Sequence, residues 1–150
     1  MMASSATGDV IVAQPRGGLV VLLERDAMAT GSTALSSGFI PAAGTRLQRE
    51  RGIEDSAEIF AADIVRKTGG QTDASIALAL AEASAATVEW LIDDHAVPLS
   101  LVDSFLYPGH SVKRMHGTPN RTGSELMAAL AAAAERRGID VVTEALVEGV

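Results

Sequence analysis

The 150-residue chain is acidic and contains no cysteine, and these two properties narrow its class before any motif is considered. A formal charge of -7 opposes nucleic-acid binding, which needs a basic face to neutralise phosphates, and the missing cysteines exclude disulfides and thiolate metal sites. Apolar runs such as Leu19–Leu23 are too short to span a bilayer. We therefore expect a cytoplasmic protein with neither a nucleic-acid nor a membrane partner.

The first predicted elements are two buried strands. Asp9–Val12 and Leu19–Leu23 are short aliphatic or β-branched runs, typical of the interior of a parallel sheet. The loop from Asp26 to Arg51 then runs for about 25 residues without periodicity, a length that is unusual unless the segment is functional.

Two helices are predicted next. Ser56–Arg66 has helical apolar spacing and ends at Gly69 and Gly70. The second helix begins after Asp73 as N-cap, and its expected apolar stripe consists of Ile76, Leu80, Val88, Leu91 and Ile92. The high alanine content predicts that helices pack through small side chains.

The last third of the chain returns to a helix and a strand. Residues 97–121 are punctuated by proline and glycine and are expected to be irregular. Thr122 and Glu125 have capping-box spacing before the helix Glu125–Arg137, and Ile139–Thr143 is expected to be a strand, with another beginning near Leu146. This order predicts a single α/β domain over residues 1–150.

Glu24 ends the second predicted strand, at the edge of a doubly wound sheet where ligands bind. A carboxylate there can accept hydrogen bonds from both ribose hydroxyls of a dinucleotide. The alternative is an ordinary solvated acid at a strand end.

The small-residue segment Thr30–Thr45 follows, with glycines that permit close backbone approach and hydroxyls that can donate to phosphate or flavin oxygens. The donors are Ser32, Thr33, Ser36 and Ser37. The alternative is a flexible surface loop, which would not need apolar residues such as Leu35, Ala42 and Ala43.

Three stretches together resemble the flavoprotein family of fumarate reductases, succinate dehydrogenases and ketosteroid dehydrogenases. They are GSTALSSGFIPAAGTRLQ, beginning at Gly31, and residues 52–91 and 107–147. The resemblance to the soluble, flavocytochrome-like branch implies a partial Rossmann-like FAD-binding domain, with a parallel sheet flanked by helices. It also implies FAD as cofactor and a small-molecule substrate of the dicarboxylate or ketosteroid type.

The resemblance assigns cofactor contacts residue by residue. Glu24 matches the family's ribose-binding acid, and Val147 lies near a backbone contact to the adenine side. The remaining implied contacts lie in the small-residue segment: Gly31, Ser32, Thr33, Ser37 and Gly38. Thr30 and Phe39 stand where the family usually has glycine.

A basic stretch from His110 to Arg121 interrupts the acidic chain and contains no acid. It favours an anion such as a dicarboxylate or a cofactor phosphate. The alternative is a structural loop held by salt bridges to Asp93, Asp94 or Asp103. The spacing of His110 and His116 carries almost no metal signal, so no metal site is expected.

The usual glycine-rich turn and helix of the family are missing after Val12, where only AQPRGG precedes the second strand. Six residues cannot hold a crossover helix, whose N-terminus normally binds the pyrophosphate. We therefore expect an amino-terminal fragment with weakened flavin affinity and no catalytic residue of its own.

Two hypotheses for function follow. The first is an FAD-dependent oxidoreductase that exchanges hydride between the flavin and an activated carbon–carbon bond. The second is a non-catalytic fragment that binds nucleotide weakly or associates through its open sheet edge. An NAD-binding module is disfavoured because its glycine fingerprint is absent.

Overall fold

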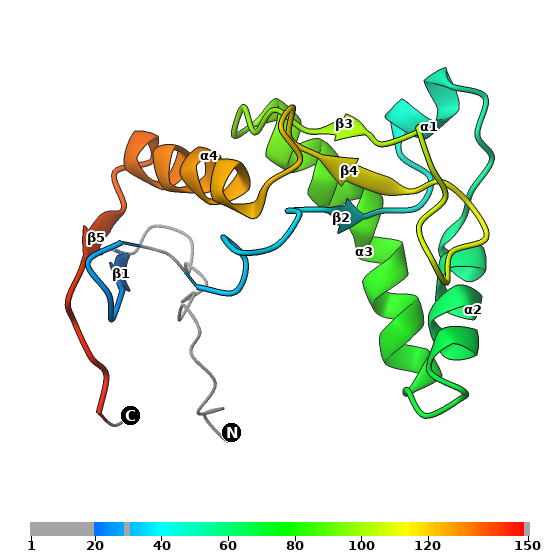
Figure 1. Ribbon diagram of the computed structural model, residues 1–150, viewed down its shortest axis with the longest axis horizontal. Coiled ribbons are helices and arrows are strands. Elements are labelled where there is room, and N and C mark those ends of the chain that lie inside the picture. Colours follow the sequence, from blue (N-terminus) through cyan, green and yellow to red (C-terminus); the bar gives the residue numbers. More distant parts are fainter. Residues whose placement is uncertain (1–19, 29–30, 149–150) are drawn as a thin grey trace. The chain divides into compact units, whose positions relative to one another are not determined.

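The computed structural model describes residues 20–28 and 31–148, which form two compact units (Figure 1). One unit combines the chain up to Gly38 with the chain from Thr122 onward, and the other is Phe39–Arg121. The strand predicted at Asp9–Val12 and the AQPRGG turn lie outside the described residues.

The first unit is built on a parallel pair of strands, β1 (Val21–Leu23) and β5 (Asp140–Val142), in which Leu22 lies opposite Val141. The ladder continues past β1, because the Glu24 amide donates to the Val142 carbonyl at 2.9 Å. Helix α4 (Gly123–Arg136) precedes β5 and packs against it. This pairing confirms the parallel sheet and the α/β class.

Helix α4 begins two residues earlier than predicted because Thr122 itself is the N-cap. Its hydroxyl oxygen accepts a hydrogen bond from the Glu125 amide at 3.3 Å. The helix ends before Gly138, whose φ of 67° lies in the left-handed region that glycine adopts without strain.

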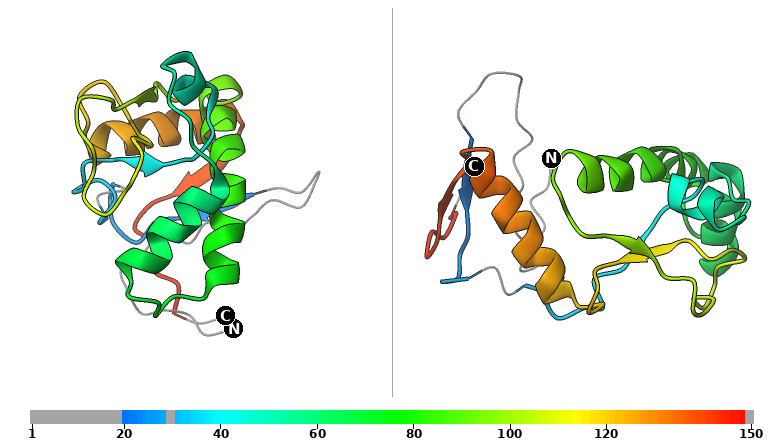
Figure 2. Two further views of the ribbon diagram at one scale, coloured as in Figure 1. Left: turned by 90° about the vertical axis from the view of Figure 1, so that its right-hand side faces the viewer. Right: turned by 90° about the horizontal axis from the view of Figure 1, so that it is seen from above.

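The second unit contains a helical hairpin, α2 (Ala57–Lys67) and α3 (Ala74–Asp93), which lie side by side in the views of Figures 1 and 2. The N-caps are Ser56, whose hydroxyl accepts from the Ile59 amide, and Asp73, whose carboxylate accepts from the Ser75 amide. Both helices therefore form where the sequence predicts them.

The second unit also contains a three-stranded antiparallel sheet that the sequence pattern does not predict. Its central strand β4 (Met115–Gly117) pairs with β2 (Ile40–Pro41) and with β3 (Ser100–Leu101). Helix α1 (Arg46–Glu50) is also unexpected, and Thr45 caps it in a reciprocal capping box with Gln48. Strands of two or three residues are too short to show periodicity, so only tertiary pairing reveals them.

The helical hairpin packs through small side chains, as the alanine content predicts. Its core cluster is Ala43, Phe60, Ala61, Ala77 and Ala81. On α3 the buried positions are Ala77, Ala81, Ser84 and Val88, a spacing of four, three and four residues along one face.

The predicted apolar stripe of α3 is wrong for its first half. Ile76 is 66% exposed and Leu80 is 54% exposed, whereas Val88 is buried as expected. The alanine and serine face allows α2 and α3 to approach closely, so the larger side chains are turned outward.

Helix α3 is, by length and composition alone, capable of crossing a membrane, contrary to the expectation that every apolar run is too short. This is weak support for a membrane span, because core helices of soluble proteins pass the same test.

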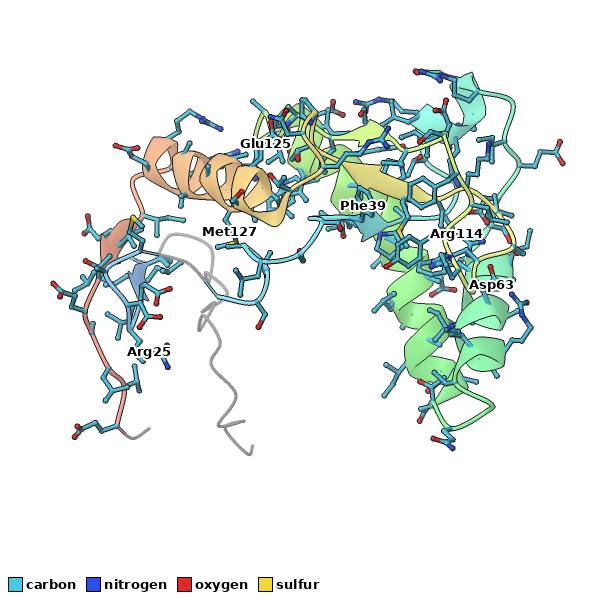
Figure 3. All side chains as sticks on the ribbon, viewed as in Figure 1. Arg25, Phe39, Asp63, Arg114, Glu125 and Met127 are labelled. Atoms are coloured by element: carbon cyan, nitrogen blue, oxygen red, sulfur yellow. The ribbon has the colours of Figure 1, made fainter. Side chains whose placement is uncertain are left out.

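A buried ion cluster joins the loop before α2, α2 itself and the segment before β4. The Arg114 guanidinium donates two hydrogen bonds to Asp55, at 2.8 and 2.9 Å, and one to Asp63 at 2.5 Å. The side chains of Arg114 and Asp55 are 0% exposed and that of Asp63 is 3% exposed. Figure 3 shows Arg114 and Asp63 together beside α2.

The cluster satisfies its charges through further donors. Burial acts to raise the pKa of Asp63, but hydrogen bonds from the Ser111 amide and hydroxyl, Arg114 and Arg66 outweigh it, and the pKa is held well below its ordinary value. The Phe60 ring lies 4.7 Å from the guanidinium carbon. Asp63 is therefore ionised at neutral pH.

Replacing Arg114 with methionine tests this cluster. Removing one partner leaves two buried carboxylates without their main counter-charge, so Arg114→Met is expected to lower the free energy of unfolding by about 3–5 kcal/mol in urea titrations. Arg51→Met is the matched control, because Arg51 pairs with Asp103 through largely exposed side chains and should cost less than about 1 kcal/mol. Equal losses in the two variants would contradict the structural role of the cluster.

Candidate functional site

The first half of the small-residue segment, residues 31–38, folds as two consecutive turns. The Ala34 amide donates to the Gly31 carbonyl at 3.0 Å, and the Ser36 amide donates to the Thr33 carbonyl at 3.1 Å. The Ser36 hydroxyl donates to the Thr33 carbonyl and accepts from the Gly38 amide. Its single proton is thus used inside the segment, so the expectation that Ser36 donates to a ligand does not hold in this structure.

These turns pack directly on the start of α4. The Gly123 amide donates to the Ser36 carbonyl at 2.7 Å. A Cβ added at Gly123 would lie 1.6 Å from the Thr33 carbonyl oxygen, and one added at Gly38 would lie 2.7 Å from the Thr122 carbonyl oxygen. Two backbones therefore meet with no room for a side chain, and Gly38 supplies a positive φ of 63° at the same point.

Three hydroxyls of this segment remain available to a ligand. Ser32, Thr33 and Ser37 are exposed, and in the described part of the chain their side chains make no hydrogen bond. The turns thus hold a short row of free donors at the surface beside the α4 N-terminus.

Glu24 lies at the carboxyl end of β1, where the sequence predicts it. It is only 6% exposed, and one carboxylate oxygen accepts from the Asp26 amide at 2.8 Å. The Ala145 amide donates to the Glu24 carbonyl at 2.9 Å, which ties this strand end to the chain after β5. The carboxylate is therefore held in place by its own turn.

The other predicted contact residues are distributed around the same unit. Val147 follows β5 and is 45% exposed. Gly31 opens the first turn, while Gly38 is buried with its amide already engaged. Thr30 lies outside the described residues. The role of each of these residues toward a cofactor stays a prediction.

Phe39 belongs to the second unit, where it packs with aromatic neighbours. Its ring lies 6.2 Å from that of Phe105 and 6.3 Å from that of Tyr107, measured between centroids. A Cβ at Gly117 would lie 2.9 Å from the Phe39 ring, so the missing side chain of Gly117 leaves room for this ring beside β4.

The basic stretch is a structural part of the second unit, but its acid partners differ from those expected. Arg114 pairs with Asp55 and Asp63, and Lys113 donates to the backbone carbonyl of Asp103 at 2.7 Å. The predicted acid Asp93 pairs instead with Arg46. Asp55 and Asp63 precede this stretch by about fifty residues, so the sequence gives no signal of the pairing.

His116 is fully buried in β4. Its Nε2 lies 3.0 Å from the Thr45 hydroxyl, which also accepts from the Gln48 amide and so links β4 to the cap of α1. Burial lowers the pKa of His116, against smaller opposing effects from nearby backbone carbonyls and Glu89. Among the described residues no group of acidic, histidine or cysteine side chains could hold a metal ion.

The comparisons with known proteins identify the family. Residues 11–150 match the family model of the FAD binding domain. The chain belongs to this family of FAD-binding domains. The match covers nearly the whole chain and confirms the resemblance found in the sequence.

Several curated relatives of this chain are fumarate reductases. It is 31% identical over 132 residues to a probable fumarate reductase Ifc3 of Shewanella frigidimarina, covering 87% of this chain and 22% of the relative. It is 31% identical over 113 residues to fumarate reductase 1 of Saccharomyces cerevisiae, covering 74% and 24%. The chain thus spans about a fifth to a quarter of the length of these relatives.

Solved structures agree. The open conformation of a flavocytochrome c3 fumarate reductase superposes with a TM-score of 0.73 at 31% identity, covering 83% of this chain and 22% of that one. A 3-ketosteroid-delta4-(5alpha)-dehydrogenase from Rhodococcus jostii RHA1 gives a TM-score of 0.63 at 24% identity, covering 81% and 32%. The second likeness shows the fold alone, and together they confirm a partial Rossmann-like domain.

FAD is the cofactor that this family assignment indicates. The described residues include groups that suit some of its polar atoms. The free hydroxyls of Ser32, Thr33 and Ser37 suit the polar oxygens and nitrogens of a dinucleotide, and a fixed carboxylate at a parallel strand end suits a ribose diol. Gly38 and Gly123 lie against protein backbone. Their missing side chains therefore allow residues 31–38 to pack on α4 and do not leave space for a cofactor.

The sequence reasoning missed Gly123 as a residue that shapes the site. The signal was a glycine at the first position of a helix, directly after the Thr122 cap, where a good helix former would cost less. A glycine at that position is explained by the close approach of another backbone segment.

Replacing Gly123 with alanine should disrupt the contact between residues 31–38 and α4. Because the added methyl meets a backbone carbonyl that cannot rotate away, we expect a loss of at least about 2 kcal/mol in the free energy of unfolding. Ser124→Ala at the next position removes an exposed hydroxyl and its solvent-exposed 3.2 Å hydrogen bond to the Thr122 hydroxyl, and should cost no more than about 0.5–1 kcal/mol. Urea unfolding of both variants measures the difference, and an unchanged midpoint for Gly123→Ala would refute the close approach.

The buried His116 predicts how stability changes with pH. Its folded-state pKa lies below the ordinary 6.5, so below that pH the unfolded chain binds more protons and stability falls as pH decreases. His116→Gln removes this proton uptake and should flatten the slope below pH 6.5 by up to about 1.4 kcal/mol per pH unit. Urea titrations of both proteins across this range measure the slope, and parallel curves would show that His116 does not titrate in this way.

Proposed function

We propose that this chain is the FAD-binding part of a flavin-dependent oxidoreductase that acts on an activated carbon–carbon bond of a small carboxylate. The family match over residues 11–150, together with the free hydroxyls of Ser32, Thr33 and Ser37, carries the proposal. The bound flavin would supply the hydride chemistry. The chain's own residues bind and orient the cofactor.

The substrate class follows from the relatives. Besides the fumarate reductases, a urocanate reductase of Eggerthella lenta is 31% identical over 125 residues, covering 83% of this chain and 20% of that protein. The names of both kinds of relative refer to reduction of unsaturated carboxylates. We therefore favour an unsaturated carboxylate, of the dicarboxylate type in the fumarate reductases, over the ketosteroid type, whose likeness rests on fold alone.

Each contact in the proposal has a separate task. Glu24, held by the Asp26 amide, accepts hydrogen bonds from the ribose hydroxyls of the adenosine half. The hydroxyls of residues 32, 33 and 37 donate to the cofactor's polar atoms. No proton donor is assigned among the described residues, and the proposal is limited to cofactor binding and orientation.

Flavin titration tests the proposal and the role of Glu24 together. We expect saturable binding of FAD in fluorescence or calorimetric titration, and Glu24→Gln should weaken it by at least roughly 10-fold, because one charge-assisted hydrogen bond contributes about 1.5–3 kcal/mol. FMN lacks the adenosine ribose, so its affinity should be equal in the two proteins. Glu82→Gln, an exposed acid on α3, is the matched control and should bind FAD as the unchanged chain does.

An equal loss of FAD and FMN affinity in Glu24→Gln would show that Glu24 does not bind the adenosine ribose. An unchanged chain that does not bind FAD would overturn the proposal itself. The second outcome, combined with concentration-dependent self-association, would favour a non-catalytic fragment. The observation behind that alternative is the exposed apolar pair β1–β5, in which Val21, Leu23, Val141 and Val142 are 38–48% exposed. Two strands by themselves are marginally stable, and edges that no other described strand covers can accept another strand.

A further inference from the structure

A cavity of about 290 Å³ lies in the second unit, between α2, α3 and the loop that precedes β4. Its walls are mainly apolar and come from Pro41, Phe60, Ile64, Leu80 and Pro108. This volume is near the lower end of ligand pockets, which suits a molecule built on one ring or a short branched chain. All of its lining residues belong to the second unit, and none of them is a proposed cofactor contact.

His110 lines this cavity. The Arg114 guanidinium lies 3.0 Å from His110 Nδ1, and a guanidinium can only donate, so Nδ1 is the acceptor. A neutral imidazole then carries its proton on Nε2, and in the described part of the chain no group accepts it. Burial and the neighbouring Arg114 lower the pKa of His110, which keeps the ring in this neutral form.

Lys67, the last residue of α2, lines the same cavity. Its stem lies across Gly109, where an added Cβ would come 2.9 Å from the Lys67 Cδ. Its ammonium has no acid partner within the described residues. The stem is thus positioned by packing while the charge remains uncompensated.

The charges around the cavity leave one positive charge in excess. Asp55 and Asp63 contribute two negative charges, and Arg114 and Arg66 balance them through ion pairs. Lys67 is the remaining charge, so a single negative charge on a ligand would complete the balance. A dianion would carry one charge too many into a mostly apolar wall.

We propose that this cavity binds a small organic monoanion with an apolar body, such as a monocyclic aromatic carboxylate. The apolar body lies against Phe60, Ile64 and Leu80, and the carboxylate accepts hydrogen bonds from Lys67 Nζ and His110 Nε2. This site is independent of the proposed FAD function and uses none of its residues.

The chain contains only two lysines, Lys67 and Lys113, which makes the test direct. In the chain labelled with ¹³C-lysine, benzoate at neutral pH should shift the Lys67 signal saturably and leave Lys113 unchanged. Lys67 is identified by the signal lost in Lys67→Arg. Benzyl alcohol, which has the ring without the charge, and succinate, which has charge without an apolar body, should bind at least about fivefold more weakly.

Variants then test the cation itself. Lys67→Met should weaken benzoate binding by about fivefold or more, whereas Lys67→Arg should retain it because the charge remains. Lys113→Met removes the same charge elsewhere in the unit and should bind benzoate as the unchanged chain does. The proposal is overturned if benzoate does not shift the Lys67 signal, if benzyl alcohol binds equally well, or if Lys67→Met keeps the original affinity.

Discussion

The second unit depends on one buried cation. Arg114 is 1% exposed, and transferring a guanidinium from water to a protein interior costs several kcal/mol unless its hydrogen bonds are replaced. Asp55 and Asp63 replace three of them, and His110 accepts a further one. Because these partners come from separate elements, satisfying one side chain fixes the loop before α2, α2 and the approach to β4 relative to one another.

Small residues are required wherever two backbone segments or two helices approach each other closely. Ala77 and Ala81 allow α3 to lie against α2, and Gly123 allows the turns of residues 31–38 to reach the start of α4. In both places a missing side chain is what the contact requires. This explains why a chain with 3% aromatic residues can still build packed units.

Close backbone packing also fixes the residues proposed to contact the cofactor. The turns that hold Ser32, Thr33 and Ser37 are closed by Ser36 and Gly123, so the donors are presented by a fixed backbone. The chain spans only about a fifth of its fumarate reductase relatives, and the described residues account for binding groups without a proton donor. The groups that these residues supply are hydrogen-bond donors and one carboxylate, which suit binding and orientation of a cofactor.

The sequence by itself determined the α/β class, the two long helices of the hairpin, α4 and the strand after it, and the family. These depend on local signals: caps such as Ser56 and Thr122, glycine stops, and small-residue motifs that a short window contains. Only the tertiary structure decided which face of α3 is buried, the strands β2, β3 and β4, and the partners of Arg114. Each of these results from contacts between residues far apart in the chain, where packing distance and the cost of an unpaired buried charge outweigh any local preference.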